Sequence, residues 1–258
     1  MDFLACCEEM AQAVSDAITP LVGTPEAGTK IKMGADGTPT QQIDLVAEEC
    51  ILAYLNEKPL GRTLVSEEAG RVDLRGNSGT IFLDPIDGTY NAVKGIPFFA
   101  LSIAYAKKGI VQEAFVQNLA TGETFTARKG MGAFLNEKPI AVSETTSLDE
   151  STFSIYGRKF DPGKVLHLGQ KIRRWRLLGA SALELCYIGC GRIDGFIDLR
   201  GTLRVTDAAA GVLVCTEAGG TVSDLDGCPL VFFDEVTIGK CLVATNGVMH
   251  RKVIEYLR

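Results

Sequence analysis

The chain has 258 residues and a formal net charge of −6. This charge gives no electrostatic reason to expect nucleic acid or an anionic membrane as the main partner. The first residues, MDFLACCEEMAQAV, carry neither a basic segment nor an uninterrupted apolar block, which predicts a cytoplasmic protein with no signal peptide or membrane anchor. Eight cysteines at scattered spacings are typical of reduced thiols, and neither of the two histidines has a cysteine at zinc-finger spacing.

The first forty residues predict a helix, a loop and the start of a second helix. Apolar residues that step by three or four indicate an amphipathic helix over residues 3–21. Residues 23–37, GTPEAGTKIKMGADG, are rich in glycine and polar side chains and predict a loop, which is either a lid or an ordinary surface connection. The sequence TPTQ at 38–41 is typical of a capping box with proline in the first helical turn, and the helix that it opens contains Asp44.

Acidic residues follow two short β-prone runs in the next part of the chain. The run RTLVS at 62–66 ends directly in Glu67, and TIFL at 80–83 ends directly in Asp84. Carboxylates at strand ends are well placed to form a site. Residues 98–140 then contain apolar runs separated by short polar turns, which predicts an antiparallel meander.

The second half of the chain alternates between strand and helix patterns. A capping box of Ser181 and Glu184 is expected to open one of the helices, which would reach about residue 191. The other expected elements are strands near 152–156, 175–178 and 196–199, helices near 163–173 and 207–218, two more strands, and a final helix from about residue 249. Mixed parallel and antiparallel layers predict an α/β protein of two closely packed lobes.

The stretch LDPIDGTYN, residues 83–91, is either a surface turn or the floor of a metal site. A lone DPxDG is usually a plain turn, because Asp, Pro and Gly suit turns for backbone reasons. Here, however, Asp84 and Asp87 flank a proline directly after a strand, and with the Ile86 carbonyl they offer the oxygen ligands that Mg²⁺ prefers. If Gly88 and Thr89 open a helix, their N–H groups would face a phosphate. The combination predicts metal-assisted phosphoester hydrolysis.

Four features in order and spacing carry a resemblance to a known family. DPIDGTYN resembles the first signature of the inositol monophosphatase family, and VTDAAAGVLVCTEAGG at 205–220 resembles the second. SEE at 66–68 and Asp44 behind a glycine-rich loop agree with the same pattern. The segments GADGTPTQQID, GIPFFALSIAYA and DLRGTLRVTD make the chain most similar to the short archaeal-type enzymes that act as both fructose-1,6-bisphosphatase and inositol-1-monophosphatase.

The resemblance implies an αβαβα sandwich with an antiparallel-rich first sheet and a second, mixed sheet, usually assembled as a homodimer. The expected N-terminal lobe, residues 1–145, would hold the lid loop and the DPIDGT motif, and the C-terminal lobe, residues 146–258, would hold substrate residues and Asp207. Two or three Mg²⁺ ions are expected, with Mn²⁺ as a substitute. The implied metal ligands are Glu67, Asp84, the Ile86 carbonyl, Asp87 and Asp207.

For catalysis, the resemblance implies that Thr89 pairs with Asp44, helped by Glu67, to orient and deprotonate the attacking water. The implied substrate contacts are Asp87, Gly88, Thr89, Arg176, Ser181 and Arg200, although Ser181 is equally typical of a helix cap. Arg158 is a weaker candidate whose pattern better fits an exposed strand end.

Arg200 stands where members dedicated to inositol phosphates tend to have a glutamate. Arginine binds phosphate bidentately, so we predict that a second phosphate is accepted and that fructose 1,6-bisphosphate is preferred, with inositol 1-phosphate also hydrolysed. Two alternatives stay open. One is a 3′(2′),5′-bisphosphate nucleotidase, which shares the metal motifs, and the other is a catalytically silent binding or regulatory protein of the same fold.

Overall fold

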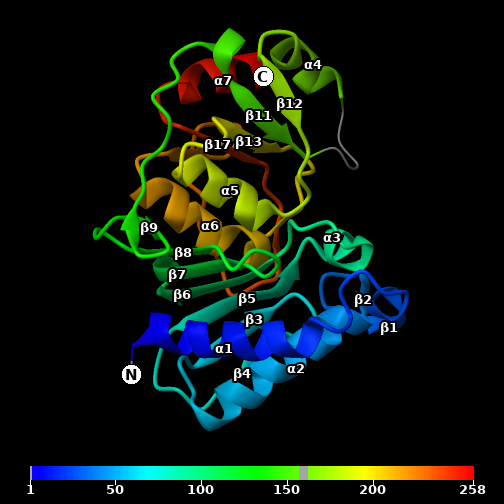
Figure 1. Cartoon of the computed structure of the whole chain (residues 1–258). Coiled ribbons are helices and arrows are strands. Elements are labelled where there is room, and N and C mark those ends of the chain that lie inside the picture. The colour runs from blue at the N-terminus through cyan, green and yellow to red at the C-terminus, as the bar shows by residue number, and fades with distance from the viewer. Residues whose placement is uncertain (1, 157–161) are drawn as a thin grey trace.

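Five alternating layers of helices and sheets make up the protein (Figure 1). The computed structural model describes residues 2–156 and 162–258. The larger sheet has the strand order β10-β9-β8-β7-β6-β5-β3-β4 and is antiparallel except where β3 pairs with β5. Its strands are β3 (Thr63–Ser66), β4 (Gly70–Asp73), β5 (Thr80–Asp87), β6 (Ala100–Lys107), β7 (Ile110–Asn118), β8 (Thr124–Arg128), β9 (Ala133–Leu135) and β10 (Lys138–Pro139). The predicted meander and antiparallel-rich first sheet are confirmed.

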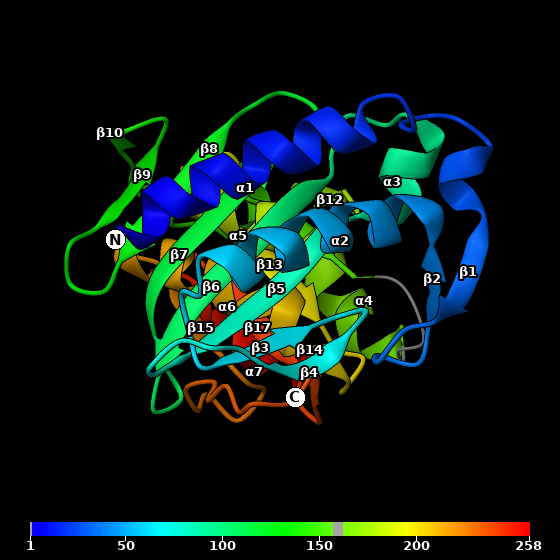
Figure 2. The same ribbon diagram turned by 90° about the horizontal axis from the view of Figure 1, so that it is seen from below.

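Two long helices, α1 (Phe3–Ile18) and α2 (Gln42–Glu57), lie side by side on the outer face of this sheet (Figure 2). The stripe that predicted α1 is the face that it buries, since Cys7, Val14 and Ile18 are inaccessible to solvent. These side chains join one apolar cluster with Leu64 and Leu83 of the sheet. Burial of this stripe therefore holds the outer helices in place.

The middle layer consists of α5 (Ser181–Gly189) and α6 (Val205–Glu217), which contact each other and both sheets. The two helices approach closely because α6 carries small residues where it faces α5. A Cβ atom added to Gly211 would lie 2.8 Å from the Cβ of Leu185, so only glycine fits there.

The second sheet has the order β12-β11-β13-β17-β15 and is mixed, as predicted, because β11 runs parallel to β12 and β13 while β17 runs antiparallel to its neighbours. The helices α4 (Gly163–Gly169) and α7 (His250–Leu257) contact each other beyond this sheet (Figure 1), which completes the αβαβα sandwich. Its strands are β11 (Thr152–Ile155), β12 (Arg174–Arg176), β13 (Gly195–Asp198), β15 (Thr221–Ser223) and β17 (Leu242–Thr245).

The division into lobes at residues 145 and 146 stays a prediction. One buried apolar cluster takes Phe82 and Phe125 from the first sheet together with Leu185 and Phe196 from the second half of the chain, so the helices of the middle layer join the two sheets.

The expected loop over residues 23–37 is in part a hairpin, which corrects the prediction. After a 3₁₀ turn, η1 (Glu26–Gly28), strand β1 (Lys30–Met33) pairs antiparallel with β2 (Pro39–Gln41). The capping box moves accordingly. Helix α2 is capped by Gln41, whose backbone N–H donates to the Asp44 carboxylate at 3.0 Å, because Pro39 lies in the strand instead of the first helical turn.

Helix α4 ends at Gly169, before the predicted end near residue 173. Trp175 packs so tightly on Gly169 that an added Cβ would lie 2.7 Å from its ring. The N–H groups of Arg173 and Arg174 turn to the Ser151 carbonyl, which starts β12 in place of another helical turn.

The remaining elements are η2 (Leu148–Glu150), the short strand pair β14 (Leu203–Arg204) and β16 (Thr237–Ile238), and helix α3 (Thr89–Lys94). Within the described residues, no helix combines the length and the apolar character needed to cross a bilayer. The eight cysteines form no disulfide bond with one another, and half of them are buried.

Candidate active site

The DPIDGT segment forms the end of β5, a tight turn at Gly88 and the start of α3. Strand β5 runs to Asp87, which extends it past the predicted run of 80–83. Asp84 is buried, and one of its carboxylate oxygens accepts the Ile86 N–H at 3.0 Å. Gly88 has a φ of 89°, in the left-handed region, and an added Cβ would lie 3.0 Å from the Gly179 carbonyl. Glycine therefore lets the turn approach the segment before α5. Asn91 fixes this approach by donating to the Leu178 carbonyl at 2.8 Å.

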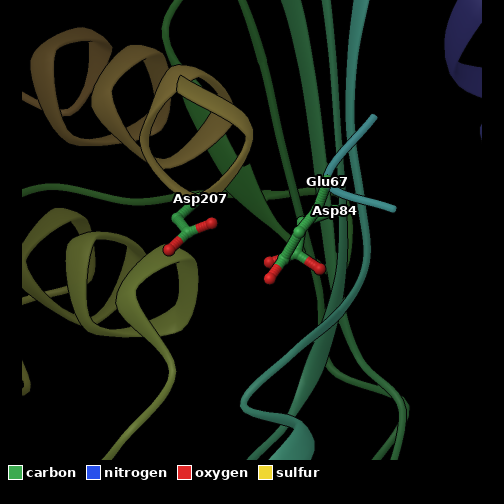
Figure 3. Close-up of side chains that lie close together, drawn as sticks. All are labelled: Glu67, Asp84 and Asp207. Atoms are coloured by element: carbon green, nitrogen blue, oxygen red, sulfur yellow. The ribbon is translucent and has the colours of Figure 1, made fainter. Parts of the chain in front are cut away.

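Three buried carboxylates converge behind this turn (Figure 3). Glu67 follows β3, Asp84 lies in β5 and Asp207 lies in the first turn of α6, and each offers an oxygen within 4.8 Å of the others. The second Asp84 oxygen, Oδ2, is buried and has no hydrogen-bond partner. An oxygen-only cluster with an unsatisfied buried acceptor fits a hard divalent cation such as Mg²⁺.

Electrostatics supports the same fit. Burial raises the pKa of the Glu67 and Asp84 carboxyls well above the usual range, and the negative charge of Asp207 raises both further. A positive charge placed among these carboxylates would reverse the effect, because it stabilises their ionised forms. A bound divalent cation would therefore add to the effect of Arg204, whose charge already lowers the pKa of both carboxyls.

Asp87 lies three residues after Asp84, at the end of β5, and its side chain caps helix α5. Its carboxylate accepts the Ser181 N–H at 3.1 Å and the Ala182 N–H at 2.6 Å. This corrects the predicted capping box, because Ser181 makes no side-chain cap and the Glu184 carboxylate instead accepts the Leu178 N–H at 2.9 Å. A metal-ligand role for Asp87 stays a prediction.

The side chains of Asp44 and Thr89 lie within hydrogen-bonding reach of each other. Burial is the largest effect on the Asp44 carboxyl and raises its pKa to about 7, while hydrogen bonds from Gln41 and Thr89 counteract part of the shift. The single hydroxyl proton of Thr89 has two acceptors, the Ile86 carbonyl at 3.0 Å and the Asp44 carboxylate. If the carbonyl is taken by another group, the proton is left to Asp44.

A pocket of about 770 Å³ opens over these residues. Its lining includes Asp44, Glu67, Ile86, Asp87, Gly88, Thr89, Ser181 and Arg200 from the predicted set, and Asp36, Tyr156, Thr202 and Arg204, which the sequence analysis did not single out. Such a volume suits a polar small molecule.

Arg200 faces this pocket from the loop after β13. Its guanidinium forms a close ion pair with Asp198, at 2.6 Å between Nη2 and Oδ2, and lies 3.8 Å from the centre of the Tyr156 ring. These contacts hold the side chain in one orientation beside the pocket.

Arg204 is a residue of the candidate site that sequence reasoning missed. It caps α6, and its Nε donates to Asp207 at 2.9 Å while Nη1 contacts both Glu67 and Asp36. The available signal was its position three residues before Asp207, a spacing that places two side chains on the same side of a helix start.

A sequence model of the inositol monophosphatase family matches residues 2–258. The chain belongs to this family. It is 42% identical to the fructose-1,6-bisphosphatase/inositol-1-monophosphatase of Methanothermobacter thermautotrophicus, over 96% of this chain and 94% of that protein. It is also 33% identical to a bifunctional NADP phosphatase/NAD kinase of Methanococcus maripaludis, covering 98% of this chain and 49% of that longer protein.

The fold of this inositol monophosphatase family member agrees with solved structures. A crystal structure described as an inositol monophosphatase–fructose 1,6-bisphosphatase aligns over 100% of both chains with a TM-score of 0.89 and 30% identity. Membership makes the protein a phosphoric monoester hydrolase of a metal-dependent family.

One candidate residue of this family member, Arg176, lies apart from the pocket. Arg176 is exposed on β12 and donates to the Trp175 carbonyl at 3.0 Å, and it is not among the described residues that line the pocket. Arg158 lies outside the described residues. The remaining members of the predicted set line the pocket or, in the case of Asp84 and Asp207, belong to the carboxylate cluster.

Proposed function

We propose that this protein is a Mg²⁺-dependent phosphatase that hydrolyses fructose 1,6-bisphosphate to fructose 6-phosphate and inositol 1-phosphate to inositol. The observation that carries the proposal is the buried cluster of Glu67, Asp84 and Asp207, with its unpartnered Asp84 oxygen, beside a pocket of about 770 Å³. The names of relatives such as those from Methanothermobacter thermautotrophicus and Pyrococcus furiosus support the two substrates.

The residues proposed to hold two or three Mg²⁺ ions, or Mn²⁺, are Glu67, Asp84, the Ile86 carbonyl, Asp87 and Asp207. Bound divalent ions supply charge neutralisation for the phosphate and Lewis acidity for the attacking water. The rest of the chemistry belongs to side chains of the chain itself.

Proton transfer is assigned to Thr89 and Asp44. The Asp44 carboxyl has a pKa of about 7, which suits a general base at neutral pH, and the Thr89 hydroxyl lies within hydrogen-bond reach of it. A water beside Thr89 would pass its proton to the hydroxyl oxygen as the hydroxyl proton moves to Asp44. Gly88 and Ser181 also line the pocket, where they would contact the phosphate group.

Arg200 is proposed to favour the bisphosphate. Its guanidinium lies at the pocket wall, held by Asp198, where a second phosphate would reach it. Arg200→Ala should therefore lower kcat/KM for fructose 1,6-bisphosphate by about tenfold or more and leave inositol 1-phosphate within about twofold. Equal losses on both substrates would contradict this assignment.

The test of the function is phosphate release with and without Mg²⁺ from four substrates: fructose 1,6-bisphosphate, inositol 1-phosphate, 3′-phosphoadenosine 5′-phosphate and NADP. Release that requires Mg²⁺ and is fastest from fructose 1,6-bisphosphate supports the proposal. A lead for 3′-phosphoadenosine 5′-phosphate or for NADP would keep the metal site and replace the substrate. No release from any of them by folded protein would favour a binding or regulatory role.

A homodimer is proposed on the same grounds as in the sequence analysis, and a cytoplasmic location stays a prediction. Edge strand β12 carries Trp175, which is 42% exposed, and Leu177, which follows the strand, is 56% exposed, so a second copy would bury apolar surface there. Light scattering coupled to gel filtration measures the mass directly. A monomer at micromolar concentration would contradict the proposal.

A further inference from the structure

Arg204 connects three carboxylates that come from three parts of the fold. Its Nε and Nη2 lie 2.9 and 2.8 Å from Oδ2 of Asp207, which stands on α6. Its Nη1 contacts Glu67, after β3, and lies 3.0 Å from Oδ2 of Asp36, at the tip of the β1–β2 hairpin. The side chain is only 22% exposed, so these contacts are made largely away from water.

Two of these partners also belong to the metal-binding cluster. Glu67 and Asp207 are the carboxylates that converge with Asp84, whose Oδ2 has no partner. A carboxylate oxygen that accepts a guanidinium N–H at hydrogen-bond distance offers fewer lone pairs to a metal ion. A divalent cation placed among these three carboxylates would also be repelled by the guanidinium charge at short range. The arginine and the metal therefore compete for the same two side chains.

The contacts also explain why an arginine suits this position. Three buried carboxylates raise one another's energy when all are ionised. The guanidinium is a fork of five N–H donors with a permanent charge, so one side chain can neutralise several carboxylates at once.

The hairpin tip is tied to the same point. The backbone N–H of Asp36 donates to the Glu67 carbonyl at 3.3 Å, and that of Ala35 donates to the Glu68 carbonyl at 3.3 Å. The Asp36–Arg204 ion pair adds a side-chain contact between this hairpin and the start of α6. Movement of the Arg204 side chain would therefore break a contact that holds the tip of the β1–β2 hairpin.

We infer that Arg204 is the internal cation of the metal-free enzyme, and that it leaves Glu67 and Asp207 when a divalent ion enters the cluster. The arginine then sets metal affinity by competition and stabilises the protein while metal is absent. This inference rests on the proposed metal site, so binding by the unchanged protein is measured first and tests that site separately.

The experiment is equilibrium binding of Mn²⁺, followed by its electron paramagnetic resonance signal, to the unchanged protein, Arg204→Gln and Arg200→Gln. The second variant is the matched control, because Arg200 lines the same pocket but pairs with Asp198 outside the cluster. Arg204→Gln should bind Mn²⁺ at least about tenfold more tightly, and Arg200→Gln should stay within about twofold. In a chelator, Arg204→Gln should also melt at a lower temperature than Arg200→Gln.

Each outcome separates the two claims. Binding by the unchanged protein with equal or weaker binding by folded Arg204→Gln overturns the inference and leaves the proposed metal site intact. Absence of binding by both proteins overturns both claims. Binding by Arg204→Gln alone supports the inference in its strongest form.

A second measurement does not depend on how well that variant folds. Crystals of the unchanged protein grown with and without Mn²⁺ should show the Arg204 guanidinium withdrawn from Glu67 and Asp207 when the ion is bound. An ion in the cluster with both contacts retained would overturn the inference. Arg204→Lys keeps the charge but loses the fork, so its Mn²⁺ affinity should fall between those of the unchanged protein and Arg204→Gln.

Discussion

Asp84 illustrates how a functional residue can oppose stability. Its carboxyl is buried beside Glu67 and Asp207, and these surroundings raise its pKa, so the ionised side chain destabilises the metal-free fold. Asp84→Asn keeps the oxygen that accepts the Ile86 N–H and removes the charge. We expect this variant to lose at least about 100-fold in Mg²⁺-dependent activity yet to melt at a higher temperature in chelator. Calorimetry with EDTA checks the second effect, and a lower melting temperature would contradict it.

Glu184 should make stability depend on pH. Burial raises the pKa of its carboxyl to about 7, although the Ser154 hydroxyl and the Leu178 N–H favour its charged form. The pKa of Glu184 in the folded protein lies above the ordinary value of 4.5, so the folded state binds this proton more tightly than the unfolded state does. The resulting stabilisation is fully present below about pH 4.5 and is lost as pH rises through 7. The loss is on the order of 3 kcal/mol.

Glu184→Gln removes this titration. Urea unfolding of the metal-free protein at pH 5, 6, 7 and 8 should show the free energy of unfolding falling less steeply with pH in the variant than in the unchanged protein. Parallel slopes for the two proteins would show that Glu184 does not titrate in this range.

Residues of the candidate site differ in how clearly the sequence predicts their positions. Glu67 and Asp84 follow β-prone runs and Asp207 lies in a signature, so their positions at strand and helix ends could be read from pattern and resemblance. Arg204 could not, because an arginine beside acidic residues in sequence is common on solvated surfaces. Only the fold reveals that Asp36 and Glu67, distant in the sequence, meet its guanidinium.

At the scale of elements, the turn between β5 and α3 controls the geometry of the site. Gly88→Ala places a methyl group 3.0 Å from both the Gly179 carbonyl and the Ala180 Cβ, at a φ of 89°. We expect about 1–3 kcal/mol of destabilisation and a large fall in kcat, because the turn must move away from α5.

Gly95→Ala is the matched control for this substitution. Gly95 ends the same helix with a φ of 68°, and within the described residues its added Cβ would meet only the Gly23 Cα at 3.6 Å. This variant pays the backbone cost without the close contact, so it should lose stability and keep kcat. Similar kcat values for the two variants would show that the approach of the turn to α5 is not needed for catalysis.

Elements with a strong local pattern were predictable, and those held by distant partners were not. Helix α1 follows its apolar periodicity, and α6 lies close to its predicted range of 207–218. The β1–β2 hairpin has no such signal, since all four residues of β1 are exposed and its strands are held by pairing with each other and by contacts of its tip to Glu67 and Glu68. Pro39 lies in β2 of this hairpin, so the lack of a strand signal also explains why the sequence predicts this residue in a helix.

At the scale of the whole molecule, the metal cluster lies where two layers meet. Asp84 belongs to the first sheet and Glu67 directly follows its strand β3, whereas Asp207 belongs to the middle helical layer (Figure 3). A cation bound by all three would join the sheet to α6. We therefore expect metal binding to stabilise the packing of the first sheet against the middle helical layer, in addition to the turn after β5.

Mg²⁺ should consequently raise the melting temperature of the intact protein. At a concentration one hundred times its dissociation constant, a ligand that binds only the folded state adds about 2.7 kcal/mol. For a chain of this size that corresponds to a shift of roughly 5–10 °C. Differential scanning calorimetry should show the shift with MgCl₂ and none with NaCl of equal ionic strength. Asp84→Asn should abolish this shift in melting temperature. Within the described residues, Arg204 forms ion pairs with Glu67 and Asp207 but not with Asp84, so this variant removes the one carboxylate of the three that lacks an ion-pair partner. An unchanged shift in Asp84→Asn would place the stabilising ion elsewhere in the molecule.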